Sequence, residues 1–350
     1  MRDPGPCEGN DGSSAVRRPG MPMKKKLILG ILLSAVLVWL SVRGIRFGDV
    51  AEGFRSIRYG FIAPAFAGML VMQVLRSWRW GLILKPLETV RPWTVFEVSN
   101  VGFLAITALP ARLGELVRPY LIARNSKIRM TAALGTILVE RVMDGATVLL
   151  MAMVALQWTP FPPWLVRSGI LFGTVMLGLI FLMIFLSFRR ENSIQAAEFI
   201  IRRFPDRVAN PIRGMLHHFI DGFQIIRNIR LLFQVFALSL LIWVVDVAII
   251  YAMFAAFALP LSVPAALIVM VVLLIGIAIP TAPGFIGNWH YACILGLGLF
   301  GIPKAEALPF AVVYHFISVL FIVIMGLPFL PFMKFSLADL QQQMNGGGKP

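Results

Sequence analysis

Long runs of apolar residues, separated by short polar stretches, dominate this chain of 350 residues. The runs occupy residues 27–42, 61–84, 93–109, 131–157, 164–188, 231–259, 262–279, 285–300 and 306–333. Because a helix rises about 1.5 Å per residue, roughly 20 apolar residues are needed to cross the hydrocarbon core of a bilayer. The pattern therefore predicts an all-α integral membrane protein, a polytopic bundle of about eight transmembrane helices.

The composition supports a membrane protein and excludes several other classes. Hydrophobic residues make up 58% of the chain and charged residues only 14%, against about 25% charged residues in soluble domains. The net charge of +15 does not indicate nucleic acid, because the basic residues are scattered over the loops, as in cytoplasmic loops beside anionic lipid. Cys7, Cys293 and the four histidines form no disulfide or metal-binding pattern, so neither a metal nor a cofactor is expected.

The N-terminal residues 1–22 have no apolar periodicity and are predicted to form a disordered leader. Met1, Met21 and Met23 are equally suitable start residues. Lysines precede the run at 27–42 and no small-residue cleavage site follows it, which favours an uncleaved transmembrane helix over a signal peptide.

One membrane domain is expected over residues 23–335, followed by a disordered tail at 336–350. With the N-terminus inside, the inner loops hold 25 Lys and Arg residues and the outer loops 6. This asymmetry predicts a multi-pass protein of the cell (inner) membrane with both termini in the cytoplasm. The segment 189–230 mixes basic and apolar residues and is expected to be a cytoplasmic interfacial linker between two halves, either helical or solvated.

Proline and glycine interrupt the chain twice in the same pattern, Pro-x-x-x-Gly followed by a polar residue. The residues concerned are Pro110 and Gly114 in the first break, and Pro283, Gly284, Gly287 and the nearby His290 in the second. A bilayer tolerates broken backbone only where protein or a water-filled cavity satisfies it, and paired breaks in the two halves of a chain indicate a transporter-type site. We therefore predict two re-entrant or broken helices, with chance placement of these residues as the alternative.

The apolar run at 131–157 contains three charged residues, Glu140, Arg141 and Asp144. Each charge costs about 2.5–3.5 kcal/mol at a helix centre, and each Leu, Ile or Val of the run returns only about 0.3–0.6 kcal/mol. The charges cannot face lipid, so we predict an intramembrane charge network, to which Asp246 is added from the run at 231–259. A functional network and a structural network that locks helices together are both open.

A second charged group, Arg112, Glu115 and Arg118, follows the first break at spacings of three residues. Two guanidinium groups around one carboxylate leave a net positive site, which suits a phosphate through bidentate hydrogen bonds. A helix starting after Pro110 would add free N–H groups and the positive end of its dipole. We predict a lipid headgroup site, and positive-inside anchoring is the alternative.

Arg79 lies between Trp78 and Trp80 in the run at 61–84. Arginine and indole side chains both suit the membrane interface, where they are placed to line the path of a headgroup. Simple anchoring at the interface explains the same pattern.

Four segments together resemble a known family: residues 109–121 (LPARLGELVRPYL), 139–145 (VERVMDG), 280–290 (PTAPGFIGNWH) and 300–302 (FGI). They are similar to the flippase-like membrane domain of lysylphosphatidylglycerol synthases and their stand-alone relatives. The resemblance runs from about residue 25 to 335. It implies a bundle with two re-entrant elements that moves a phospholipid or polyprenyl-linked lipid between leaflets, with the arginines and the glutamate of the first segment near the headgroup.

This chain departs from the family pattern in two places. Many relatives carry Glu where this chain has His290, and no soluble aminoacyl-transferase domain follows residue 335, so lysyl transfer is not expected. We expect a lipid translocase whose partner is an anionic phospholipid or polyprenyl-linked lipid, with homo-oligomerisation left open. The alternatives are a membrane enzyme using a polyprenyl-phosphate donor, with Asp49 or Glu52 as base, and a non-transporting scaffold of an envelope lipid pathway.

Overall fold

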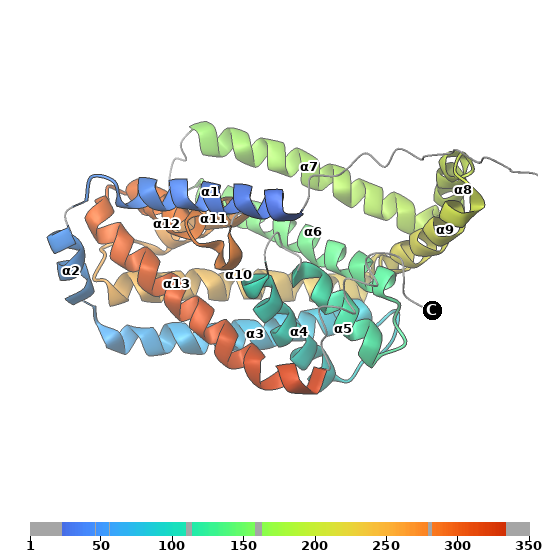
Figure 1. Ribbon diagram of the computed structural model, residues 1–350, viewed down its shortest axis with the longest axis horizontal. Helices are drawn as coiled ribbons and strands as arrows, with labels where there is room; N and C mark the ends of the chain where they lie inside the picture. The colour runs from blue at the N-terminus through green and yellow to red at the C-terminus, as the bar shows by residue number, and fades with distance from the viewer. Residues whose placement is uncertain are drawn as a thin grey trace, which may run out of the picture.

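The computed structural model describes residues 23–45, 47–55, 57–109, 114–157, 163–278 and 282–333. Within these ranges the chain is helical and contains no strand (Figure 1). The α-helices are α1 (Met23–Val42), α2 (Phe47–Arg55), α3 (Ile62–Leu84), α4 (Pro92–Ala108), α5 (Val117–Asn125), α6 (Met130–Ala155), α7 (Pro163–Phe188), α8 (Arg190–Ile201), α9 (Asp206–Asp221), α10 (Ile229–Ala256), α11 (Val263–Ala278), α12 (Asn288–Gly298) and α13 (Lys304–Gly326). Short 3₁₀ helices cover Tyr59–Phe61, Gln224–Arg227, Pro283–Phe285 and Leu327–Met333. The predicted leader at 1–22 and tail at 336–350 lie outside the described residues.

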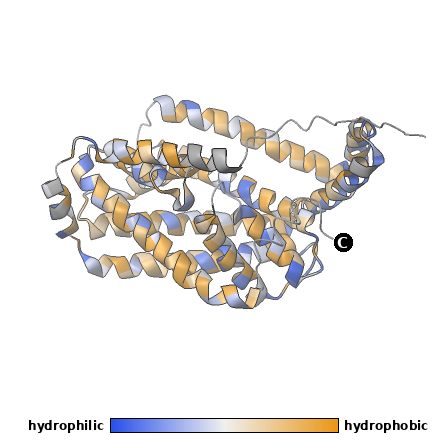
Figure 2. Ribbon diagram, viewed as in Figure 1, coloured by the Kyte–Doolittle hydropathy of each residue, from blue (hydrophilic) through white to orange (hydrophobic). Residues whose placement is uncertain are grey.

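Several described helices are long enough to cross a bilayer. Four are also apolar enough by composition: Tyr59–Leu84, Pro163–Phe188, Ile229–Ala256 and Lys304–Met333. The helices α1 and α6, with 20 and 26 residues, are also long enough to cross a bilayer. Figure 2 shows hydrophobic residues along most of α7 and α13. The predicted all-α integral membrane architecture is confirmed.

The helices α4 and α5 form a re-entrant hairpin, called hairpin 1 (residues 92–125). They run antiparallel, because Gly102 lies against Arg118 while Gly114 lies against the backbone of Ala105 and Ile106. A Cβ atom on Gly114 would lie 2.2 Å from the amide nitrogen of Ile106, so only glycine permits this close approach. With 9 residues, α5 extends only about 14 Å and cannot cross a membrane.

The helices α11 and α12 form the second re-entrant hairpin, called hairpin 2 (residues 263–298). The Asn288 side chain donates a hydrogen bond of 3.1 Å to the Gly276 carbonyl, and Gly296 lies against Val269, so the two helices are also antiparallel. The turn between them contains residues with positive φ, at Gly284 (71°) and Gly287 (94°). Both predicted broken helices are therefore hairpins that return to the side from which they entered.

The two hairpins enter the bundle from opposite ends. The preceding helices α3 and α10 are antiparallel neighbours, because Gly68 lies against Ile249 and Arg79 contacts Ser239. Hairpin 1 follows the end of α3 and hairpin 2 follows the end of α10, so each half contains one unit of helix, hairpin and helix in inverted orientation. Packing follows the same symmetry, since α4 contacts α13 and α11 contacts α6. This is the inverted-repeat architecture of many transporters.

The tips of the hairpins lie next to each other. A Cβ atom on Gly284 would lie 3.9 Å from the Thr107 carbonyl oxygen near the end of α4. The Gly284 carbonyl also accepts a hydrogen bond of 2.7 Å from His315 of α13, which ties hairpin 2 to the last long helix. The turn of hairpin 2 therefore lies between the end of α4 and the middle of α13.

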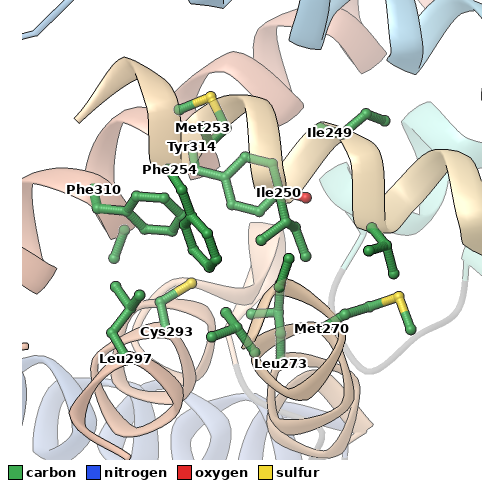
Figure 3. Packing of buried hydrophobic residues seen from close by; sticks show 14 of the residues in the cluster. Ile249, Ile250, Met253, Phe254, Met270, Leu273, Cys293, Leu297, Phe310 and Tyr314 are labelled. Carbon is green, nitrogen blue, oxygen red and sulfur yellow. The ribbon is translucent and has the colours of Figure 1, made fainter. Parts of the chain in front are cut away.

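The apolar core is divided between the two units. Residues of α10 to α13 form one cluster, which includes Phe254, Cys293 and Phe310 (Figure 3). A second cluster surrounds hairpin 1 and α6, with Trp80 and Tyr120 among its largest members. The two units are nevertheless packed together, because the first cluster also contains Met69 of α3 and Met151 of α6, and α4 contacts α13.

The segment 189–230 forms the helices α8 and α9, which project from one end of the bundle in Figure 1. Both carry basic side chains together with exposed Phe199 and Met215. This composition fits the predicted position at a membrane interface. The cytoplasmic side of this segment stays a prediction.

Cysteine labelling tests the orientation. In a chain with Cys7 and Cys293 replaced by alanine, a membrane-impermeant maleimide added to intact cells should label Lys304→Cys and leave Asn192→Cys unlabelled. Both positions are exposed, and α10 separates them across the membrane. Permeabilised cells are the control, in which both should react. Labelling of Asn192→Cys from outside would overturn the orientation.

Candidate functional site

A network of buried charges lies where α3, α5 and α6 meet, and it is called the ion network below. Its members are Arg79, Arg118, Glu140, Arg141 and Asp144. Glu140 lies ten residues from the start of α6, or about 15 Å along its axis, and is 1% exposed. The two predicted carboxylates of α6, Glu140 and Asp144, are therefore buried in the protein, whereas Arg141 between them is exposed.

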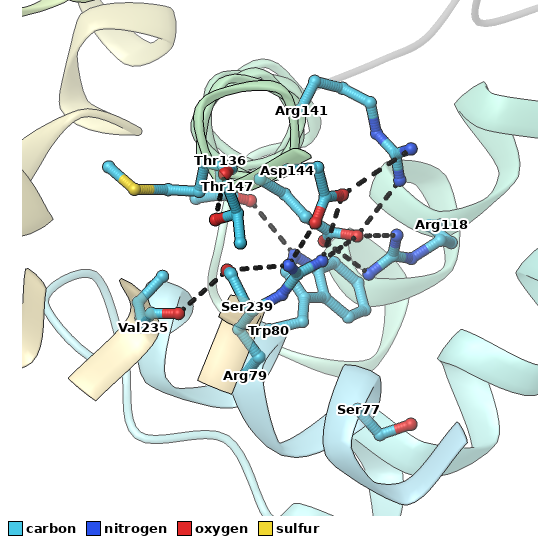
Figure 4. Close-up of polar contacts among 12 residues, drawn as sticks. Ser77, Arg79, Trp80, Arg118, Thr136, Arg141, Asp144, Thr147, Val235 and Ser239 are labelled. Carbon is cyan, nitrogen blue, oxygen red and sulfur yellow. Dashed lines mark hydrogen bonds and ion pairs between the residues drawn. The ribbon is translucent and has the colours of Figure 1, made fainter. Parts of the chain in front are cut away.

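Arg79 of α3 joins both carboxylates of α6. Its guanidinium group pairs with Asp144 and lies 3.2 Å from Glu140 Oε1. It also donates a hydrogen bond of 2.9 Å to Ser239 Oγ of α10, and the Trp243 indole donates one of 3.2 Å to Asp144. Figure 4 shows Arg79 of α3, Asp144 of α6 and Ser239 of α10 converging on one another.

Arg118 of α5 binds Glu140 with both terminal nitrogens, at 3.1 and 3.0 Å. Such a bidentate pair is among the strongest side-chain interactions in proteins. The Arg118 guanidinium lies 4.2 Å from the Trp80 ring centre and 5.2 Å from that of Phe103, so aromatic faces hold it in place. Hairpin 1 thus presents its arginine directly to α6.

Gly102 creates the space that Arg118 occupies. A Cβ atom on Gly102 would lie 2.1 Å from Arg118 Cγ. Gly102→Ala is therefore expected to lower the free energy of unfolding by about 1–3 kcal/mol, measured by thermal unfolding in detergent. Gly178→Ala in α7 is the matched control, because nothing lies within 4 Å of its Cβ position. Equal unfolding temperatures for the two variants would contradict this packing.

The charges of the ion network do not balance. Three guanidinium groups face two carboxylates, which leaves one net positive charge among the described residues. The Nε atoms of Arg79 and Arg118 are buried and have no hydrogen-bond acceptor there. The buried Arg79 and Arg118 balance the two carboxylates, so the excess charge belongs to the half-exposed Arg141. The unpaired Nε donors, by contrast, lie in the interior, where an unpaired donor is costly. The network therefore has the charge and the donors to receive one anion.

Arg141 is the most accessible charge of the ion network, with its side chain 50% exposed. It lies 3.1 Å from Glu140 and 3.9 Å from Asp144. Arg141 thus lies close to both carboxylates of its own helix, and α3 and α5 supply further partners for them. An anion approaching the network can reach Arg141 before it reaches the buried arginines.

The other predicted site residues lie in different places. Arg79 is buried in the ion network and not at the interface, whereas its neighbour Trp78 is exposed. Glu115 is half-buried beside Gly114 at the start of α5, and Pro110 and Arg112 lie outside the described residues. Asp246 of α10 interacts electrostatically with Arg76 of α3. The second group, Pro283, Gly284, Gly287 and His290, lies at the tip of hairpin 2 and the start of α12.

Sequence reasoning missed several uncharged polar residues of the site. Ser239 binds Arg79, and the buried Gln73 donates a hydrogen bond of 2.9 Å to Asn100 of α4. A single amide or hydroxyl side chain barely changes the hydropathy of an apolar run, so the hydropathy pattern does not reveal it as a site residue. For Gln73 the available signal was its spacing of three residues to Arg76 and six to Arg79 on the same predicted helix.

The fold and the ion network define a polytopic α-helical membrane protein with two re-entrant hairpins and a charged cluster between its helices. Comparison with known proteins gives its family: the model of the lysylphosphatidylglycerol synthase transmembrane region matches residues 27–326. The chain belongs to this family. Two UPF0104 membrane proteins of Methanothermobacter thermautotrophicus are similar over most of their length. One is 22% identical, over 91% of this chain and 98% of the relative, and the other 26% identical, over 85% and 89%.

Proposed function

We propose that this protein moves a lipid with a phosphate in its headgroup, a phospholipid or polyprenyl-linked lipid, between the two leaflets of its membrane. The observation that supports this most is the ion network, which has three guanidinium groups for two carboxylates and two buried N–H donors without an acceptor among the described residues. A phosphodiester carries one negative charge and accepts bidentate hydrogen bonds from arginine. A phosphodiester therefore supplies the negative charge and the hydrogen-bond acceptors that the ion network lacks among the described residues.

The internal carboxylate Glu140 makes binding reversible in this proposal. Glu140 accepts two hydrogen bonds from Arg118 and pairs with Arg79, and a phosphate could accept the same hydrogen bonds. The incoming headgroup meets Arg141 first and then competes with Glu140 for Arg118. Because one charge-assisted pair replaces another, the headgroup exchanges without leaving a bare arginine in the membrane interior.

The inverted repeat supports movement across the membrane and not only binding. Hairpin 1 and hairpin 2 enter from opposite ends and meet near Gly284 and Thr107. Transporters with inverted repeats place their substrate sites where such broken elements meet and open them to either side in turn. The ion network lies on hairpin 1 and its neighbouring helices, beside this meeting point.

Reconstitution in liposomes tests the proposal. Purified protein is inserted into vesicles that contain a phosphatidylglycerol with a fluorescent acyl chain, and a membrane-impermeant reductant bleaches the lipid of the outer leaflet. Active protein should raise the bleached fraction from about half towards completion, without added nucleotide or divalent metal. Protein-free vesicles are the control. A bleached fraction that stays at half contradicts the proposal, and release of a chemically altered lipid would favour an enzyme.

A further inference from the structure

We infer that hairpin 2 carries a second binding site for the headgroup phosphate, formed by the uncharged donors Trp289 and His290 and supported by His315. The inference deepens the proposed lipid movement and rests on it. The site lies at the start of α12, directly after the turn of hairpin 2.

The indole of Trp289 points to a missing acceptor. Its Nε1 atom is buried and has no hydrogen-bond partner within the described part of the chain. An indole N–H can only donate, so a buried one without an acceptor requires an explanation, such as a ligand. The ring itself is held firmly, stacked on His315 at 5.1 Å between centres and packed on Tyr314 at 5.4 Å.

His290 supplies a second donor next to Trp289. The backbone N–H of Gly287 points at its Nδ1 atom over 3.4 Å, so a neutral ring carries its hydrogen on Nε2. His315 donates its own Nε2 hydrogen to the Gly284 carbonyl and contacts the His290 ring edge to face, at 4.9 Å. The positive φ of Gly287, 94°, turns the chain so that α12 starts here. Hairpin 2 and α13 thus hold the two donors in a fixed arrangement.

The position of this group repeats that of the ion network. In the first unit Arg118, on the short returning helix of hairpin 1, contacts Glu140 on the following long helix α6. In the second unit His290, on the returning helix of hairpin 2, contacts His315 on the following long helix α13. The inverted repeat therefore places one polar group at the corresponding position of each unit.

The ion network offers charged donors and the hairpin 2 site offers neutral ones, and this difference suits a substrate that must both bind and be released. Arginines form charge-assisted hydrogen bonds to phosphate, which are about twice as strong as those of neutral donors. A headgroup held by neutral Trp289 and His290 is bound more weakly than one in the ion network. Hairpin 2 therefore serves as the site of transfer to or from the opposite leaflet.

Photocrosslinking distinguishes this inference from the proposed function. A phosphatidylglycerol with a diazirine in its headgroup is added to the full-length protein in liposomes and irradiated, and the labelled peptides are mapped by mass spectrometry. Labelling is expected at residues 114–118 and at 284–291. The double variant Trp289→Phe, His290→Leu should lose the second label and keep the first. Labelling at hairpin 1 alone overturns the second site, and labelling at neither hairpin overturns the proposed function as well.

A transport measurement checks the same site with a milder change. Trp289→Phe keeps the ring and removes only the N–H donor, so lipid redistribution should slow about 3- to 10-fold, the effect of one neutral hydrogen bond. Trp93→Phe is the matched control, because Trp93 is exposed and packs on Phe96 and Phe329 far from the hairpin 2 turn. Equal rates for the two variants would refute a role for the Trp289 indole.

Discussion

Arg118→Lys is expected to slow lipid redistribution by about 10- to 150-fold, because a charge-assisted hydrogen bond contributes about 1.5–3 kcal/mol. Lysine keeps the positive charge and one contact to Glu140, but it loses the planar fork that now makes two bonds, at 3.1 and 3.0 Å. The change therefore removes phosphate recognition while it preserves the charge of the ion network. The rate is measured with fluorescent phosphatidylglycerol in liposomes at matched protein content.

Arg124→Lys is the matched control for this experiment. Arg124 lies on the same short helix, is exposed at its end, and pairs with the neighbouring Tyr120 hydroxyl, outside the ion network. It should transport like the parent protein. If Arg118→Lys also does so, with an unchanged elution profile in size-exclusion chromatography, Arg118 is not part of a phosphate site and serves only to hold hairpin 1 to α6.

Glu140→Leu should lower the free energy of unfolding by about 3–5 kcal/mol, the usual effect of leaving a buried partner charge unpaired. Glu140 compensates Arg79 and Arg118, both of which are almost completely buried, at 1% and 2% exposure. Without it, three guanidinium groups would face Asp144 alone. Thermal unfolding in detergent micelles measures the loss.

The double variant Glu140→Leu, Arg118→Leu provides the decisive comparison. Removing both partners restores the excess of one positive charge in the ion network, so much of the lost stability should return. The double-mutant cycle then gives the coupling energy between Glu140 and Arg118. Glu306→Gln in the exposed first turn of α13 is the control and should change stability by less than about 0.5 kcal/mol. Additive effects of the two network substitutions would show that Arg118 and Glu140 are not energetically coupled.

The two results together separate the structural and functional roles that the sequence leaves open. A purely structural ion network predicts loss of stability in Glu140→Leu and little change of transport in Arg118→Lys. A phosphate site predicts loss of transport in Arg118→Lys while the protein stays folded. Because the two variants alter different properties, each role is tested by its own measurement.

Much of the architecture follows from local sequence. A run of apolar residues longer than about 20 has few stable conformations in a bilayer other than a helix, because every backbone group must be satisfied within the segment. The short runs at 93–109 and 262–279, each next to a Pro-x-x-x-Gly break, predicted the two hairpins. The burial of Glu140 and Asp144 was also predictable, because their insertion cost excludes a lipid-facing position.

The partners of these charges were decided by tertiary structure. Sequence placed Arg79 at the interface with Trp78, because arginine beside indole is typical of that position. In the folded protein Arg79 lies inside the bundle and pairs with carboxylates 61 and 65 residues further along the chain. Only the packing of α3 against α6 and α10 brings these groups together, and no local pattern encodes which helix face meets which. The same holds for the inverted repeat, because spacing in the sequence shows two breaks, whereas the antiparallel contact of α3 and α10 shows that their hairpins enter from opposite ends.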